Sequence, residues 1–280
     1  MEASGSNGSS IPPPAKRAKS SSRAPALDQF VRTVLLQTLL KRGDALLELS
    51  CGKGRDMGKF QRAFIGSYVG VEPNAEARAE AEETWRRKQA PFTAEFVDAD
   101  PLDQVARPLR LPQGAAFDGV LCFGQLHQSF ASEALATAFL KGVSAHLKDG
   151  GFFFGCMPDP AHVWNKAQKS ILRQMGEMAK AGVKDEAAQL EGFQPSIANH
   201  VYKVALPDCE FSPFGCQWEL TVGGGAPSAH YYVHYPTLLR LAAAEGLELV
   251  SAPNFVDFYE DYKAIFWHDI QKLGVASNER

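Results

Sequence analysis

The sequence predicts an α/β protein built on a doubly wound, largely parallel sheet. Short apolar runs alternate with stretches of helical spacing, a pattern typical of parallel strands joined by crossover helices. The first run, residues 45–49, ends at a small loop with two glycines, residues 50–54 (SCGKG). A second run, residues 67–71, ends in Glu72. An acid at this strand tip, about twenty residues after such a loop, is typical of folds that bind a ribose diol.

The remaining elements follow the same alternation. Ser132 is a candidate N-cap and Gly246 a candidate helix stop, and the apolar run 152–156 predicts a fully buried strand. We expect a mobile loop over residues 182–199. In chain order, the expected strands are residues 45–49, 67–71, 92–97, 117–123, 152–156 and 247–251, with an antiparallel pair at 202–206 and 216–222. The expected helices are residues 27–41, a segment from the glycine loop to about Gly66, and residues 75–89, 132–147, 161–181 and 237–245.

The loop at residues 50–54 favours S-adenosylmethionine over a dinucleotide. It lacks a full G-x-G-x-x-G pattern, and Glu48 lies just before it. S-adenosylmethionine has no pyrophosphate to hold, so its loop needs fewer glycines than a dinucleotide loop. We therefore predict a class I S-adenosylmethionine-dependent methyltransferase fold, a Rossmann-like doubly wound sheet with a small antiparallel insertion. The alternative is an ordinary strand-loop-helix unit with a chance pair of glycines.

Composition limits the class of protein. The chain has 280 residues, of which 45% are hydrophobic, and a formal net charge of −3. Nucleic-acid binding must therefore come from a local basic patch and not from the overall field. The five cysteines form no C-x-x-C pair, which favours reduced, buried thiols in an intracellular protein. No apolar run approaches the length of a membrane span, and the N-terminus does not resemble a secretory signal, so no membrane partner is expected.

Residues 1–24 differ in composition from the rest of the chain. They are rich in Ser, Gly, Pro and Ala and hold almost no large apolar side chain, which predicts a disordered tail before a single domain at 25–280. The tail carries the basic cluster 16–19 (KRAK). Such a cluster in a flexible tail predicts nuclear import. The alternative is a solvated tail, or one that touches RNA phosphates without specificity.

Three motifs together resemble the messenger-RNA cap guanine-N7 methyltransferases, most of all the divergent second plant-type form. They are residues 47–56 (LELSCGKGRD), 150–159 (GGFFFGCMPD) and 232–242 (YVHYPTLLRLA), the last followed by 255–259 (FVDFY). The resemblance runs from about Asp28 to Tyr262. It implies methyl transfer from S-adenosylmethionine to the N7 of the 5′ guanosine cap, with capped pre-mRNA as substrate. It also implies a nuclear protein whose partners could include the capping guanylyltransferase or the RNA polymerase II machinery.

The resemblance assigns candidate cofactor residues. Arg32 lies where the family has a lysine at the methionine end of the cofactor. Glu72 would hold the ribose hydroxyls, and Asp100 the adenine amine. The alternatives are a helix-face arginine for Arg32, a helix cap for Glu72 and a turn former for Asp100. The full set of cofactor residues that we expect is Arg32, Glu48, Ser50, Gly52, Glu72, Asp100, Gly124 and Gln125.

The resemblance also assigns candidate residues on the cap side. His127 matches the histidine that contacts the cap guanine, although it could be an ordinary loop histidine. Lys53, Arg55 and Lys59 are candidates for the triphosphate because basic groups near a helix start suit phosphate; they could equally form a solvated helix start. The expected set for cap and RNA is Asp28, Lys53, Arg55, Lys59, His127, Gln128 and His230. Tyr231, Tyr232 and Tyr235 are better explained as packing residues than as guanine-stacking residues.

The chain also departs from the family pattern. Gln128 replaces a tyrosine, His230 occupies the position of a glutamate that reads the guanine edge, and Ser50 replaces the first glycine of the loop. His230 could therefore lie on a solvated strand face. The family's last strand has no counterpart before Arg280, which predicts an unpaired sheet edge. These departures leave two alternatives: a methyltransferase for a small molecule, or a non-catalytic cap-binding homologue that activates a capping enzyme.

The expected chemistry needs few reactive side chains. Guanine N7 has a free lone pair at neutral pH and the sulfonium is a good leaving group, so no general base is required. Catalysis then consists of in-line placement and electrostatics. We accordingly expect no catalytic acid or base and no metal-ligand cluster among the histidines and acids.

Overall fold

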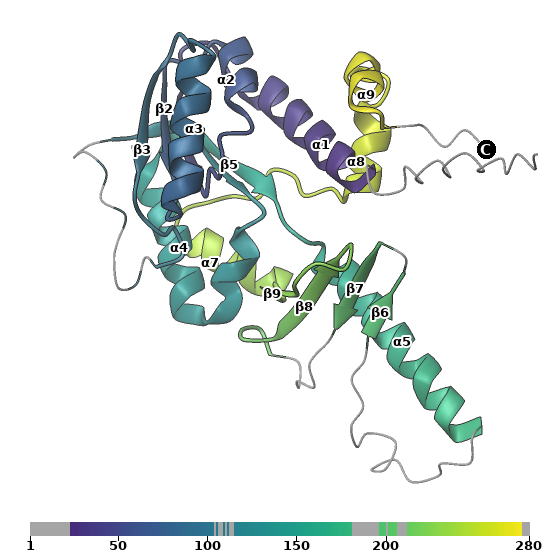
Figure 1. Ribbon diagram of the computed structural model, residues 1–280. Coiled ribbons are helices and arrows are strands. Elements are labelled where there is room, and N and C mark those ends of the chain that lie inside the picture. Colours follow the sequence, from purple (N-terminus) through teal and green to yellow (C-terminus); the bar gives the residue numbers. More distant parts are fainter. Residues whose placement is uncertain are drawn as a thin grey trace, which may run out of the picture.

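Five parallel strands form the central sheet of the protein (Figure 1). The computed structural model describes residues 23–103, 105, 109, 111, 115–180, 196–199, 201–205 and 212–275. The strand order is β3-β2-β1-β4-β5, and each neighbouring pair is parallel. The strands are β1 (Ala45–Leu49), β2 (Ser67–Val71), β3 (Thr93–Val97), β4 (Phe117–Phe123) and β5 (Leu147–Cys156). The sheet order reverses direction between β1 and β4, where ligands bind in doubly wound folds.

Helices cover both faces of this sheet. One face packs against α1 (Arg23–Leu39), α2 (Met57–Ala63) and α3 (Ala75–Arg87). The other face packs against α4 (Glu133–His146) and α7 (Tyr235–Ala244). Ser132 accepts a hydrogen bond from the amide of Leu135 and so caps α4, as the sequence predicts.

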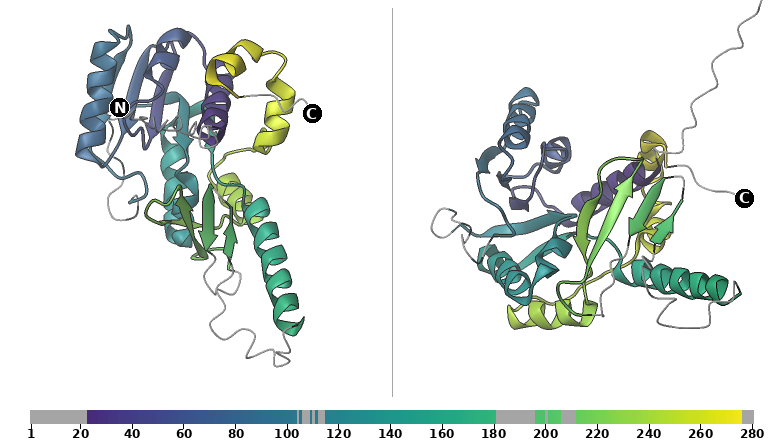
Figure 2. Two further views of the ribbon diagram at one scale, coloured as in Figure 1. Left: turned by 45° about the vertical axis from the view of Figure 1, so that its right-hand side comes forward. Right: turned by 60° about the horizontal axis from the view of Figure 1, so that its bottom comes forward.

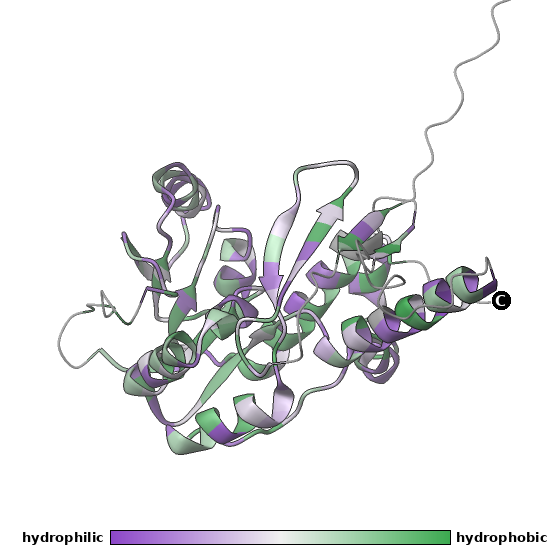
Figure 3. Cartoon of the chain, turned by 90° about the horizontal axis from the view of Figure 1, so that it is seen from below, coloured by the Kyte–Doolittle hydropathy of each residue, from purple (hydrophilic) through white to green (hydrophobic). Residues whose placement is uncertain are grey.

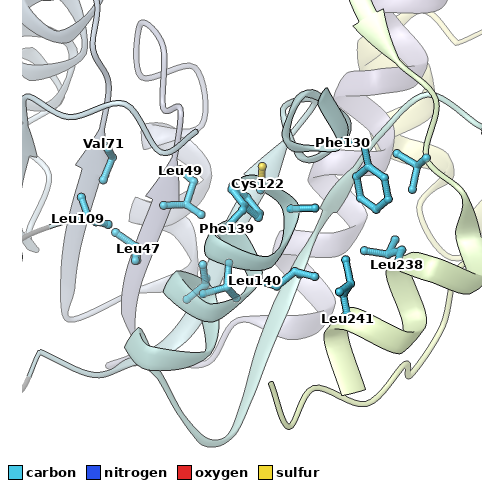
Figure 4. Packing of buried hydrophobic residues seen from close by; sticks show 14 of the residues in the cluster. Leu47, Leu49, Val71, Leu109, Cys122, Phe130, Phe139, Leu140, Leu238 and Leu241 are labelled. Atoms are coloured by element: carbon cyan, nitrogen blue, oxygen red, sulfur yellow. The ribbon is translucent and has the colours of Figure 1, made fainter. Parts of the chain in front are cut away.

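Alternate side chains of the strands supply the two halves of the core. Leu46 and Leu121 point toward α1 and α2, where they meet Met57 and Phe60. Their neighbours point the opposite way, toward the aromatic and aliphatic side chains of α4 and α7 (Figure 4). Both sets are almost completely buried, which is why the central strands are near-continuous apolar runs in the sequence.

A second, antiparallel sheet forms the insertion. It has the order β6-β7-β8-β9, with β6 (Ser196–Ala198), β7 (Tyr202–Ala205), β8 (Gln217–Val222) and β9 (Ser228–Tyr231). The long helix α5 (Pro160–Lys180) packs one end against this sheet through Trp164 and then projects away from the body (Figure 2). Hydrophobic and hydrophilic residues alternate around α5 (Figure 3).

The C-terminal helices return to the start of the domain. The helices α8 (Phe255–Tyr262) and α9 (Trp267–Leu273) pack against α1, where Phe258 and Ile270 meet Phe30 and Val34. The first helix begins at Arg23, so it includes the last two residues that the sequence assigns to the tail. None of the described helices combines the length and the hydropathy needed to cross a bilayer.

Two sequence predictions about strands were wrong. Residues 247–251 form no strand and belong to neither sheet. The amide of Leu247 bonds to the carbonyl of Ala242 at the end of α7, and Leu249 and Val250 are largely exposed. The strand expected at 152–156 is part of β5, which begins at Leu147. It is not fully buried, because β5 lies at the edge of the described sheet, and Phe152 is 37% exposed. Most of the loop expected at 182–199 lies outside the described residues, and its end forms β6.

Candidate functional site

The loop between β1 and α2 turns sharply. Ser50, Gly52 and Gly54 have left-handed backbones, with φ of 61°, 54° and 69°. A Cβ on Gly54 would lie 3.0 Å from the Cα of Ala81 in α3, so this glycine allows the helix to pack closely. A Cβ on Gly52 would meet nothing within 4 Å, so open space lies beside the backbone there. Ser50 holds a conformation that suits glycine better than serine.

Glu72 lies directly against this loop. The amide of Gly52 donates to Glu72 Oε2 at 2.9 Å, and the amide of Asn74 donates to Oε1 at 3.0 Å. The N-cap of α3 is Asn74, whose Oδ1 accepts from the amide of Ala77 at 2.8 Å. Glu72 therefore does not act as the helix cap. Its carboxylate joins the tip of β2 to the tip of β1.

The two acids after β3 have different partners. Arg78 of α3 donates to Asp98 Oδ2 at 3.0 Å and to the carbonyl of Glu72 at 2.7 Å. Asp100 Oδ1 accepts from the amide of Leu102 at 2.9 Å. This is the local hydrogen bond of a turn-forming aspartate. An adenine contact through Asp100 stays a prediction.

The end of β4 adds a second open position. Gly124 has φ of 84°, and a Cβ there would meet nothing within 4 Å. Its amide donates to the carbonyl of Cys156 at 2.8 Å, which ties the ends of β4 and β5 together. Gln125 precedes the short 3₁₀ helix η2 (Leu126–Ala131) and accepts from the amide of Gln128 at 2.9 Å. Gly52, Glu72 and Gly124 thus line the carboxyl edge of the parallel sheet.

Two histidines far apart in the sequence meet above this edge. His127 of η2 and His230 of β9 approach with 2.7 Å between His127 Nε2 and His230 Nδ1. His127 is only 2% exposed, whereas His230 is half-buried. The side chain of Gln128 donates to the carbonyl of Ala229 at 2.8 Å beside them. These contacts attach the insertion to the end of β4.

A group of buried charges lies under the loop. Arg32 of α1 donates to Asp28 at 3.0 Å and to Asp56 at 2.9 Å, and its guanidinium lies 4.2 Å from the ring centre of Phe123. Burial alone would lower the pKa of Arg32, but Asp56 and Asp28 outweigh burial and raise it. Lys59 binds the other oxygen of Asp56, whose side chain is only 1% exposed.

Glu48 is buried in the sheet beside this group. Its Oε2 accepts from the hydroxyl of Tyr68 at 2.7 Å, and the residue is 4% exposed. Burial, and then the charge of Asp56, raise the pKa of Glu48 to about 8. Glu48 is thus placed to hold a proton at neutral pH.

The cations near the loop differ in exposure. Lys53 pairs with Glu80 at 2.7 Å and Arg55 with Asp28 at 3.0 Å, and both side chains are more than half exposed. Lys59 is 11% exposed and also donates to Gln29 at 2.8 Å. The structure therefore leaves Lys53 and Arg55 open to an arriving anion and encloses Lys59 in the protein.

An apolar, aromatic pocket opens between the starts of α5 and α7. It has a volume of about 460 Å³. Its lining residues are Pro160, Ala161, Trp164, Tyr232, Val233, His234 and Tyr235. Tyr232 and Trp164 meet edge to face, with ring centres 5.8 Å apart, and Tyr232 is 5% exposed, so Tyr232 has the packing role that the sequence favours for it.

Several residues of the site have no role that the sequence predicts. Asp56 holds two buried cations, and its position directly after the glycine loop was the available signal. Trp218 and Ser228 contact His230, but no local pattern marks them because they lie on different strands of the insertion. Throughout the described part of the chain, no three His, Cys, Asp or Glu side chains are grouped closely enough to hold a metal ion.

Comparison with known proteins identifies the family. The sequence matches the family model of the mRNA (guanine-N(7))-methyltransferase domain over residues 15–274. It is 30% identical over 246 residues to mRNA cap guanine-N(7) methyltransferase 2 of Oryza sativa subsp. japonica, covering 86% of this chain and 68% of that protein. The protein of the same name in Arabidopsis thaliana is also 30% identical over 246 residues, with 86% and 66% covered. The chain thus spans about two thirds of the length of these two relatives.

A solved structure gives a weaker likeness. An S-adenosylmethionine-dependent methyltransferase from Clostridium acetobutylicum ATCC 824 superposes with a TM-score of 0.49 at 14% identity, covering 82% of this chain and 84% of that one. The family match spans nearly the whole described domain, including both sheets and the edge that gathers Gly52, Glu72 and Gly124. The chain belongs to the mRNA (guanine-N(7))-methyltransferase domain family.

Proposed function

We propose that this protein transfers a methyl group from S-adenosylmethionine to N7 of the 5′ guanosine cap of mRNA. The observation that carries the proposal is the convergence at one sheet edge. The open loop at Gly52, the acid Glu72 and the open turn at Gly124 lie beside the histidine pair from η2 and β9. Membership of the family supplies the reaction and the substrate class.

Features of the carboxyl edge support our proposal that the cofactor binds there. Gly52 and Gly124 leave space where a side chain would project, and Glu72 is held at the tip of β2 with its carboxylate against the loop. A carboxylate there suits a ribose diol, because it accepts hydrogen bonds from both hydroxyls. S-adenosylmethionine would supply the methyl group from its sulfonium, and the leaving group is a neutral thioether that needs no proton. We assign Gly52, Glu72, Gly124 and Gln125 to the cofactor.

The protein's part in the reaction is placement of the acceptor. Guanine N7 carries its own lone pair, so no residue has to remove a proton before methyl transfer. The rate then depends on holding N7, the methyl carbon and sulfur in line, in a site closed to water. We assign His127 and His230 to the guanine side, since both lie above the end of β4.

Two exposed cations suit the triphosphate of the cap. Lys53 lies in the loop and Arg55 directly follows it. Their acidic partners, Glu80 and Asp28, are partly exposed, and a phosphate can replace them. Lys59 and Arg32 are held instead by Asp56. We propose that Arg32 and Lys59 support the loop and α1. They would then affect the cofactor only indirectly, by holding these segments in place.

The place of action follows from the substrate. We propose that the protein acts in the nucleus, on capped pre-mRNA, next to the capping guanylyltransferase and the RNA polymerase II machinery. The basic cluster 16–19, which lies outside the described residues, is the candidate import signal. Fusing residues 1–24 to a fluorescent reporter should direct the reporter to the nucleus. Replacing the cluster's three basic residues, Lys16, Arg17 and Lys19, by alanine should abolish this effect, and a reporter with the unchanged cluster that stays cytoplasmic would contradict the import role.

The function is tested by methyl transfer from labelled S-adenosylmethionine to capped RNA. We expect transfer to RNA with an unmethylated guanosine cap and none to the same RNA with an adenosine cap. Nuclease digestion should release the label as 7-methylguanosine. Binding of S-adenosylhomocysteine without transfer to either RNA would reject the proposal. Such a result would favour a small-molecule methyltransferase or a non-catalytic activator.

A further inference from the structure

The histidine pair has a geometry that fixes how its protons are arranged. The planes of His127 and His230 differ by only 23°, their centres are 5.0 Å apart, and two ring nitrogens approach to 2.7 Å. Rings that lie nearly parallel and touch through nitrogen atoms meet edge to edge in a common plane. Trp218 of β8 packs on the face of His230, with ring centres 4.7 Å apart and planes at 25°. Both rings are thus held in place.

A chain of hydrogen bonds gives the pair a direction. The hydroxyl of Ser228 donates its one proton to the carbonyl of Leu220 at 3.1 Å. Ser228 Oγ must then accept from His230 Nε2, 2.9 Å away. His230 Nδ1 is left as an acceptor, and His127 Nε2 donates to it. His127 Nδ1 therefore carries a bare lone pair, and it is a buried nitrogen without a hydrogen-bond partner among the described residues.

This arrangement is electrically neutral. Each ring carries one proton, and the groups that face the pair, Trp218, Ser228 and the amide of Gln128, have no charge. No described carboxylate makes a hydrogen bond or an ion pair with either ring. Burial lowers the pKa of both histidines, to about 4 for His127, where His230 adds to the effect. A buried lone pair also costs less than a buried, unpaired N–H would.

The methylated cap differs from the unmethylated cap by one charge. Methylation at N7 turns a neutral guanine into a cation. A carboxylate beside the base would attract that cation and hold the product more tightly than the substrate. A neutral pair of imidazoles gives no such preference.

On the basis of the function proposed above, we propose that His127 and His230 act as a neutral guanine-side pair that binds the unmethylated cap and its N7-methylated product with similar affinity. The pair then adds no charge–charge attraction that would hold the methylated cap in the site after transfer. His230 is the specificity-determining member because it is the half-buried ring. His127 is its positioning partner: it is buried in the protein and holds the ring of His230 through the hydrogen bond from its Nε2.

Binding of two cap dinucleotides tests this proposal. The full-length protein is saturated with S-adenosylhomocysteine, so that no transfer occurs, and is titrated calorimetrically with GpppA and with 7-methyl-GpppA. We expect the two dissociation constants to agree within about threefold, because the pair and the groups that face it carry no charge. The variant His230→Glu should bind the methylated dinucleotide at least about tenfold more tightly than the unmethylated one. The matched neutral variant His230→Gln should keep the two constants close together.

The outcomes separate this inference from the proposed function. A wild-type protein that prefers the methylated dinucleotide by about tenfold or more would overturn the neutral pair and leave the methyltransferase function standing. A His230→Glu variant that binds S-adenosylhomocysteine normally but shows no preference for the methylated cap would also overturn it. If the wild type binds S-adenosylhomocysteine and neither dinucleotide, the proposed function itself fails.

Histidine protonation gives a readout that does not depend on cap binding. Long-range proton–nitrogen NMR spectra of the protein should show an unprotonated Nδ1 and a protonated Nε2 for His127 at pH 6 to 7. The same tautomer, with the proton on Nε2, is expected for His230. The same spectra of Ser228→Ala should show a redistribution of tautomers on His230. A doubly protonated His127 at pH 6 would contradict the proposal.

Discussion

Asp56 holds together the charges beneath the glycine loop. Its carboxylate is almost fully buried, with Arg32 on one oxygen and Lys59 on the other. Because a buried ion pair is costly to form but more costly to break, such a group ties α1 to α2 firmly. The loop that we assign to the cofactor rests on these two helices.

Removal of the Asp56 charge should destabilise the protein strongly. Asp56→Asn leaves the buried Lys59 without a counter-charge and Arg32 with Asp28 alone, for which we expect a loss of about 3–5 kcal/mol in the free energy of unfolding. Urea denaturation at pH 7 measures it. Asp98→Asn is the matched control: Asp98 also pairs with an arginine, but its side chain is 72% exposed, and its loss should cost at most about 1 kcal/mol. Equal effects of the two substitutions would contradict the role of Asp56.

Glu48 should make stability depend on pH. Burial, followed by the charge of Asp56, raises its pKa to about 8 from an ordinary value of 4.5, so the folded state binds this proton more tightly than the unfolded state. The resulting stabilisation is complete below pH 4.5 and is lost as the pH rises toward 8. Glu48→Gln removes the titration. The unfolding free energy of the wild type should therefore fall relative to that of Glu48→Gln between pH 5.5 and 8.5, and parallel profiles would show that Glu48 does not titrate in this range.

Glu72 should be needed for stabilisation by the cofactor product. S-adenosylhomocysteine at 100 times its dissociation constant should stabilise the wild type by about 2.7 kcal/mol. Glu72→Ala should lose most of this gain at the same ligand concentration, because it lacks the acceptor for the ribose hydroxyls. Thermal unfolding with and without ligand measures the difference. Glu76→Ala, in the exposed first turn of α3, is the control and should keep the full shift; an unchanged shift in Glu72→Ala would remove Glu72 from the cofactor site.

At the scale of elements, the contact between β4 and β5 depends on a glycine. A Cβ on Gly155 would lie 1.8 Å from the carbonyl oxygen of Cys122, which is too close for any side chain. The two strands come together here because Gly155 has none. The same pair of strands sets the position of Gly124 through its bond to Cys156.

Alanine at Gly155 should therefore disrupt the sheet. We expect Gly155→Ala to be recovered in low yield or to lose more than about 3 kcal/mol of stability, because the strands must separate. Gly176→Ala on α5 is the matched control, since a Cβ there meets nothing within 4 Å. That change should be neutral or should stabilise by up to about 1 kcal/mol, because alanine favours a helix. Chemical denaturation compares the two, and a Gly155→Ala protein as stable as Gly176→Ala would contradict the geometry.

The sequence predicts the elements whose signals are local. The strands β1, β2 and β4 are mainly apolar runs that end at marked residues, so their positions and the edge formed by Gly52, Glu72 and Gly124 can be predicted. The segment 247–251 has the composition of a strand, but pairing decides whether a strand forms, and in the described structure this segment pairs with no strand. The pattern of residues in one segment cannot show whether that segment pairs with another strand.

At the scale of the whole molecule, the insertion completes the site. His127 and His230 are separated by 103 positions, and they meet only because β9 is attached to η2 at the end of β4. This contact could not be predicted from the residues alone, because His127 lies in a 3₁₀ helix that follows the parallel sheet and His230 lies in a strand of the insertion. The enclosure of Lys59 by Asp56 has the same cause, since it depends on how α1 and α2 pack. Long-range packing therefore decides which of the candidate residues face a ligand.

The most direct test of methyl transfer to guanine N7 uses a cap in which this nitrogen is replaced by a carbon. RNA with a guanosine cap and RNA with a 7-deazaguanosine cap differ by one atom, and both keep the Watson–Crick edge and the triphosphate. Methyl transfer from S-adenosylmethionine to the guanosine cap and none to the 7-deazaguanosine cap is the result that we predict. Comparable transfer to both would show that the acceptor lies elsewhere on the RNA and would contradict a site built to present guanine N7.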